Sequence, residues 1–150
     1  MRAGVATALT AAVVSLGLVA CGPTGPDEDR IRDELRGMAE ALADSDVRGT
    51  LAPLADDFTG VTWNMDERAA RLLLLRELRA REQLRARVFD IDVELRGESR
   101  AVANFQVVLT GGSGLIPETG RWYRVESGWR LDGNDWKLVS AEWEPVAGRR

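Results

Sequence analysis

Residues 129–138 read Trp-Arg-Leu-Asp-Gly-Asn-Asp-Trp-Lys-Leu, in which an Asp-Gly-Asn-Asp turn separates two segments rich in strand-forming residues. Pairing Leu131 with Trp136 extends the two segments into strands over residues 119–131 and 136–144. Tryptophans recur every seven residues at positions 122, 129, 136 and 143, but the turn and the glycines between them exclude a coiled coil. The stretch therefore predicts a β-hairpin.

Two more strands are expected before this hairpin, over residues 88–95 and 101–110. In the first of them apolar and acidic residues alternate, which predicts one buried and one solvated face. The apolar set is Phe89, Ile91, Val93 and Leu95, and the acidic set is Asp90, Asp92 and Glu94. A brief fifth strand is expected over residues 57–63.

The N-terminal half of the sequence has helical periodicity. Ile31, Leu35, Met38 and Leu42 recur at helical spacing and predict one apolar stripe of a helix. The acidic segment at residues 44–46 ends that helix and caps a short second one over residues 47–54. A third helix is expected over residues 65–85, opened by Asn64.

This order of elements predicts an α+β domain in which a strongly curved sheet wraps around helices. Residues 54–58, the helix at 65–75 and the hairpin at 129–138 resemble the nuclear transport factor 2-like superfamily, which includes ketosteroid isomerases and polyketide cyclases. The resemblance spans about residues 28–145. It implies a cone-shaped domain whose N-terminal helices pack in a curved antiparallel sheet, often around a small-molecule cavity.

The N-terminus has the features of an export signal. An apolar run follows Arg2, and residues 18–21 read Leu-Val-Ala-Cys, which resembles a bacterial lipobox. We therefore expect a signal peptide at 1–20, a lipidated Cys21 that binds the membrane, a flexible tether at 21–27 and the domain at 28–146. Gly22 after the cysteine favours the periplasmic face of the outer membrane if the cell is Gram-negative. A membrane-spanning helix and an ordinary secretory signal are the alternatives.

Composition excludes several classes of function. The 150 residues contain no histidine, which excludes Ser-His-Asp catalysis and histidine-ligated zinc. The net charge of −4, or −5 without residues 1–20 because only Arg2 is lost, argues against a nucleic-acid partner. The Asp-rich turn lacks the later ligands of a calcium loop. We expect no metal and no cofactor.

The resemblance also argues against isomerase chemistry. It places the hydrogen-bonding tyrosine of ketosteroid isomerases at Met38, their general base at residues 62–64 and their oxyanion-binding aspartate at Ser127. None of these positions carries a carboxylate or a tyrosine. We therefore expect no catalytic residues of this type. The alternative is an isomerase- or cyclase-like enzyme that uses a cavity carboxylate, with Asp57 and Glu142 as candidates.

A non-catalytic binding domain is the preferred interpretation. The cavity candidates for a small apolar ligand are Trp63, Phe105, Tyr123, Ser127 and Trp129. A second apolar cluster is expected on the outer face of the sheet if no bulge interrupts the hairpin. It consists of Val102, Val108, Trp122, Val139 and Trp143, and it predicts a homodimer or an envelope protein partner.

Overall fold

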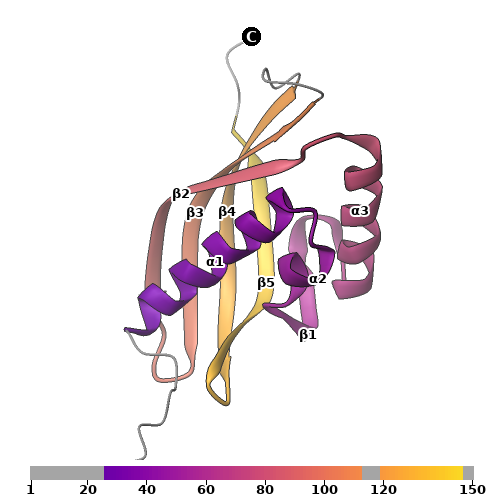
Figure 1. Ribbon diagram of the computed structural model, residues 1–150. Coiled ribbons are helices and arrows are strands. Elements are labelled where there is room, and N and C mark those ends of the chain that lie inside the picture. The colour runs from indigo at the N-terminus through magenta and orange to yellow at the C-terminus, as the bar shows by residue number, and fades with distance from the viewer. Residues whose placement is uncertain (1–25, 113–118, 147–150) are drawn as a thin grey trace, which may run out of the picture.

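The computed structural model describes residues 26–112 and 119–146, in which helices pack on one side of a curved sheet (Figure 1). In chain order the elements are α1 (Asp27–Ala43), α2 (Val47–Leu51), β1 (Leu54–Gly60), a 3₁₀ turn η1 (Val61–Trp63), α3 (Glu67–Ala80), β2 (Arg85–Leu95), β3 (Arg100–Gly111), β4 (Thr119–Asp132) and β5 (Asp135–Pro145). Cys21, the expected signal peptide at 1–20 and most of the expected tether lie outside the described residues. No helix in the described ranges is both long and apolar enough to cross a membrane.

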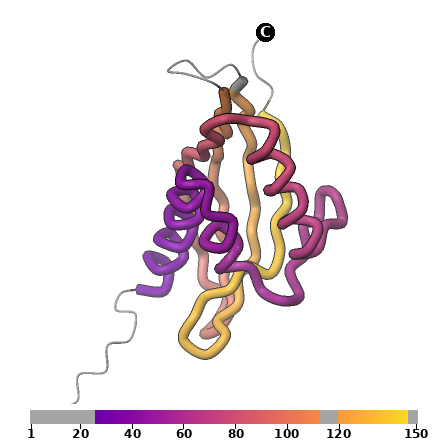
Figure 2. Tube along the Cα trace, turned by 45° about the vertical axis from the view of Figure 1, so that its right-hand side comes forward, coloured from indigo at the N-terminus to yellow at the C-terminus, as the bar shows by residue number. Residues whose placement is uncertain are grey.

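The strands are ordered β1-β5-β4-β3-β2. The four strands from β2 to β5 pair antiparallel, whereas β1 pairs parallel to β5. The expected α+β fold is therefore confirmed, with one parallel pair in a sheet that was expected to be antiparallel. Helix α1 crosses the concave face and α3 stands beside it (Figures 1 and 2).

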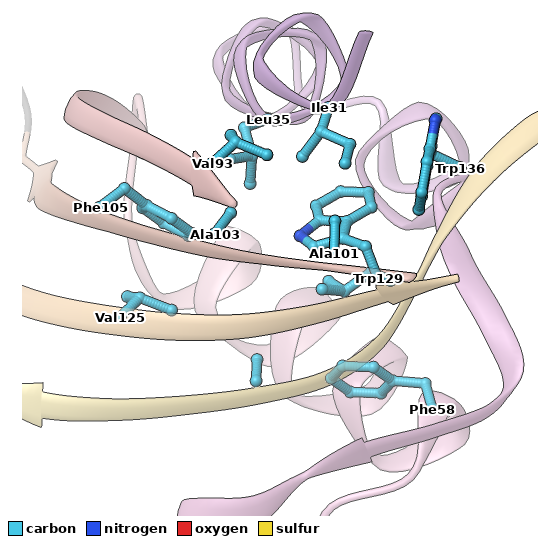
Figure 3. Packing of buried hydrophobic residues seen from close by; sticks show 12 residues of the cluster. Ile31, Leu35, Phe58, Val93, Ala101, Ala103, Phe105, Val125, Trp129 and Trp136 are labelled. Carbon is cyan, nitrogen blue, oxygen red and sulfur yellow. The ribbon is translucent and has the colours of Figure 1, made fainter. Parts of the chain in front are cut away.

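The core forms where α1 lies on the concave face. Ile31 and Leu35 point from α1 toward the sheet, and the indole of Trp129 lies beneath Ile31 (Figure 3). Trp129 is only 1% exposed. The cluster of buried core residues runs from Ile31 to Ala141, so residues 22–150 carry the whole of this core, and we expect them to fold as one domain.

Helix boundaries follow local capping. The side chain of Asp46 accepts a hydrogen bond from the Gly49 amide at 3.0 Å, as expected for the cap of α2. The expected cap at Asn64 is wrong, because Asp66 caps α3 and accepts from the Ala69 amide at 2.7 Å. Asn64 instead adopts a left-handed conformation that ends η1, where the sequence predicted the end of a strand.

A bulge in the hairpin changes which residues share a face. Gly128 pairs with Ser140 and Trp129 pairs with Leu138, so Val139 is the extra residue on β5. Beyond the bulge Trp143 pairs with Val125, a buried residue of the concave face. The expected outer-face position of Trp143 is therefore wrong, because one inserted residue reverses the alternation of the strand.

A second bulge interrupts β2 between Phe89 and Asp92. Phe89 pairs with Gln106 and lies on the outer face, where its ring is 6.3 Å from that of Trp122 between centroids. The prediction that Phe89 is on the buried face is wrong for the same geometric reason. Asp90 has a positive φ of 52°, and its carboxylate accepts a hydrogen bond from Gln106 at 2.7 Å.

Candidate functional site

A cavity of about 550 Å³ lies between α3 and the half of the concave face that α1 leaves uncovered. Its wall is mainly apolar, and its charged groups come from α3, the residue that ends α3, and β4. The apolar residues are Trp63, Met65, Leu73, Leu84, Val107, Leu109, Val125 and Trp143, and the polar residues are Arg76, Glu77, Arg81, Arg121 and Tyr123. This size and composition are typical of small-molecule sites.

The cavity exists because α3 packs loosely. Although this helix contains four consecutive leucines, none of its residues is buried. Leu73 faces the cavity, whereas Leu72 is 60% exposed. The helix contacts α2 and β1. The space between α3 and the concave surface of β3 and β4 remains open.

Two tryptophans form one end of the cavity. The rings of Trp63 and Trp143 are 5.0 Å apart between centroids and meet edge to face at 84°. Gly60 permits this packing, because a Cβ atom there would lie 3.0 Å from the Trp143 ring and 3.3 Å from Met65. Trp63 remains 59% exposed at the mouth.

Backbone contacts hold η1, and with it Trp63, against β5. Gly60 and Met65 exchange backbone hydrogen bonds of 2.6 and 3.0 Å. The Thr62 hydroxyl accepts from the Trp143 amide at 3.0 Å and donates to the Trp143 carbonyl at 3.2 Å. The aromatic end is therefore built on a short, braced turn.

Charged side chains form the opposite end. Glu77 accepts from Arg81 Nε at 3.0 Å and lies 3.4 Å from an Arg76 guanidinium nitrogen. The stem of Arg81 packs over Gly111, where an added Cβ would lie 3.1 Å from Arg81 Cδ. Arg121 enters the wall from β4.

The five residues that the sequence predicted for a ligand cavity fall into two groups. Trp63 and Tyr123 line the cavity. Phe105, Ser127 and Trp129 lie in the buried interior beneath α1 instead. Whether any of the five contacts a ligand stays a prediction, but only the first two are placed to do so.

Ser127 has a structural hydrogen-bonding role. Its hydroxyl donates to the Ala103 carbonyl at 3.0 Å and accepts from Trp129 Nε1 at 2.9 Å. Both partners are buried, so the hydroxyl proton is already in use. Ser127 is therefore not a free donor for an oxyanion.

Neither carboxylate proposed from the sequence lines the cavity. Asp57 is exposed and accepts two hydrogen bonds from Arg130, at 2.9 and 3.1 Å, which hold the pKa of Asp57 below its usual range. Glu142 is exposed and pairs with Glu126 across the sheet. The cavity carboxylate is Glu77, which is ion-paired. Within the described ranges no cluster of acidic, cysteine or histidine side chains could hold a metal.

Comparison with solved structures identifies the architecture. An NTF2-like protein of Cytophaga hutchinsonii superposes with a TM-score of 0.65 at 15% identity, covering 81% of this chain and 100% of its own. The domain has the nuclear transport factor 2-like (NTF2-like) fold. An NTF2-like protein of unknown function from Pseudomonas putida gives a TM-score of 0.67 at 20% identity, covering 81% and 88%.

A scytalone dehydratase-like protein of Novosphingobium aromaticivorans has the same NTF2-like architecture, with a TM-score of 0.69 at 12% identity and coverage of 81% and 85%. In sequence, no protein-family profile and no curated protein matches the chain. At these identities the likeness establishes the fold and leaves function to the residues of the site.

The Arg130 interaction gives a first prediction. The hydrogen bonds that Arg130 donates lower the pKa of both Asp57 and Asp132. The two carboxylates therefore stabilise the folded state fully at pH values above the pKa that they have in the unfolded chain. That stabilisation is lost as the pH falls through their lowered folded-state pKa. In an Arg130→Gln variant, ¹³C NMR titration of the carboxyl groups should give a higher pKa for both aspartates. Arg96→Gln, which removes the Glu94 ion pair instead, should change neither, and an unaltered Asp57 pKa in Arg130→Gln would refute the assignment.

Proposed function

We propose that this chain is a lipid-anchored protein of the cell envelope whose NTF2-like domain binds a small apolar ligand without catalysing a reaction. The observation that carries the proposal is the cavity of about 550 Å³ with its aromatic end at Trp63 and Trp143. Such pockets commonly measure about 300–1,000 Å³ and bury most of a small ligand.

The distribution of polar groups supports binding over catalysis. An isomerase- or cyclase-like reaction needs a base within reach of the substrate. Asp57 and Glu142 do not line the cavity, and Glu77 is engaged by Arg81 and Arg76. The Ser127 hydroxyl is bonded inside the core. The enzyme alternative therefore has little support from the placed residues.

The position of the N-terminal end of α1 supports a tethered arrangement. Arg30 of α1 donates to the Asn134 carbonyl in the β4–β5 turn, and Trp136 Nε1 donates to Asp27 at 3.1 Å. Arg121 lies near the other end of β4, about 35 Å from the turn along the strand at the usual rise per residue. An anchor at Cys21 would then hold the turn toward the membrane and leave the charged end of the cavity facing the aqueous phase.

The outer face of the sheet supports a protein partner as a second role. Val102, Val108 and Trp122 lie on the outer face, as expected from the sequence. Phe89 lies on the same face beside Trp122, which is 43% exposed. Val139 lies at the bulge beside Gly128, also on this side. A partly exposed aromatic pair on a sheet face is suited to an interface, and a homodimer through this face is our proposal for its occupant.

Filling the cavity should weaken ligand binding. Leu109 and Thr110 are neighbours on β3 and face opposite sides of the sheet. For residues 22–150, Leu109→Trp should weaken binding of the apolar fluorophore N-phenyl-1-naphthylamine by about tenfold or more, because the new side chain occupies the site. Thr110→Trp is the matched control and should bind as the wild type does. Equal binding by both variants would exclude this cavity as the site.

The lipid anchor is tested in the full chain. In a bacterial host fed an alkyne fatty acid, the wild-type protein should acquire the label and sediment with membranes. Cys21→Ala should lose the label and appear in the soluble fraction, because the thiol is the attachment point. Thr24→Ala should behave like the wild type. Retention of the label by Cys21→Ala would rule out lipidation at this residue.

The dimer is tested by sedimentation velocity of residues 22–150. Trp122→Glu should convert a dimer to a monomer, because it places a charge in the apolar contact. Trp63→Glu, which places the same charge at the more exposed tryptophan of the cavity mouth, should remain dimeric. If the wild type sediments as a monomer, the proposed interface is wrong.

A further inference from the structure

The cavity carries more positive than negative charge, although the protein as a whole is acidic. Its wall contains three guanidinium groups and one carboxylate, an excess of two positive charges. The whole chain has a net charge of −4. The excess is therefore local to this site and opposite in sign to the protein.

Two of the guanidinium groups reach the same end of the cavity from different elements. The stem of Arg81 packs on Gly111, two residues along the same face of β3 from Leu109. Leu109 is the cross-strand partner of Arg121. Arg81, just after α3, and Arg121, on β4, therefore flank one apolar position from two sides, away from the aromatic end at Trp63 and Trp143.

The carboxylate in the wall does not neutralise this end. Glu77 is shared by Arg81 and Arg76. Among residues 26–112 and 119–146, Arg121 has no ion pair or hydrogen bond to its guanidinium group. It is exposed at the rim, so its charge needs no partner for folding. A planar fork of donors is thus presented at the edge of an apolar cavity.

We propose that the ligand is a small amphipathic anion, with an apolar body between the aromatic end and Tyr123 and a single anionic head group bound by Arg121. This inference rests on the proposed binding function. A guanidinium group binds a carboxylate or a similar oxyanion through two parallel hydrogen bonds. The apolar body of the ligand displaces water from the apolar walls of the cavity. The lower local dielectric constant that results strengthens the contact between the guanidinium group and the anion. The ligand is therefore expected to bind in one orientation, because the cavity is charged at the end that binds its head group and aromatic at the end that contacts its apolar body.

Two fluorophores with one aromatic body separate charge recognition from apolar binding. N-phenyl-1-naphthylamine is neutral, and 8-anilino-1-naphthalenesulfonate is the same body with a sulfonate. In titrations of residues 22–150, Arg121→Gln should weaken binding of the sulfonate by about tenfold and change binding of the neutral probe by less than about twofold. Arg121→Lys should recover part of the lost affinity. Arg124→Gln, on the outer face of the same strand, should alter neither.

A second pair of probes tests a natural head group. Decanoate should displace the neutral fluorophore at a lower concentration than 1-decanol, and this preference should vanish in Arg121→Gln. If both fluorophores bind but Arg121→Gln leaves the preference for the anion intact, the charge inference is overturned and the apolar binding function stands. If neither fluorophore binds the wild type, both proposals fall together.

Discussion

The packing of α1 against Trp129 is the contact on which the rest of the domain depends. The indole is buried beneath Ile31 (Figure 3), and its N–H is bonded to Ser127, which is bonded in turn to the Ala103 carbonyl. A buried N–H without a partner is costly, so this chain of bonds fixes the ring and with it the position of α1. Because α1 covers only this part of the curved sheet (Figure 1), the remaining concave surface is left to α3.

The cavity follows from the manner in which α3 meets that surface. Gly60 and η1 direct the chain past Trp143, and α3 then packs against β1 and α2 without burying any residue. A helix that packed fully on β3 and β4 would fill the space with leucine side chains. The loose contact instead leaves an apolar wall, with charged residues where α3 ends and β4 begins.

The two bulges separate the roles of the tryptophans. With unbroken alternation, Trp122 and Trp143 would share the outer face. The extra residue at Val139 turns Trp143 into the cavity, while Trp122 stays outside and gains Phe89 through the bulge in β2. The bulge in β5 therefore places Trp143 in the cavity, and the bulge in β2 gives Trp122 an aromatic neighbour on the face of the proposed interface. The N-terminal end of α1 lies instead at the β4–β5 turn, where Arg30 donates to the Asn134 carbonyl.

The sequence by itself determined the helices, the four long strands and the α+β fold, because the periods of Ile31–Leu42 and of the strands are local properties of neighbouring residues. The absence of histidine from the sequence also excluded Ser-His-Asp catalysis and histidine-ligated zinc. Only the tertiary structure decided that Phe105, Ser127 and Trp129 belong to the core while Trp143 and Arg121 line a cavity. The positions of bulges and the distance between a helix and a sheet depend on contacts between residues far apart in the chain. A pattern of neighbouring residues in the sequence does not show these contacts.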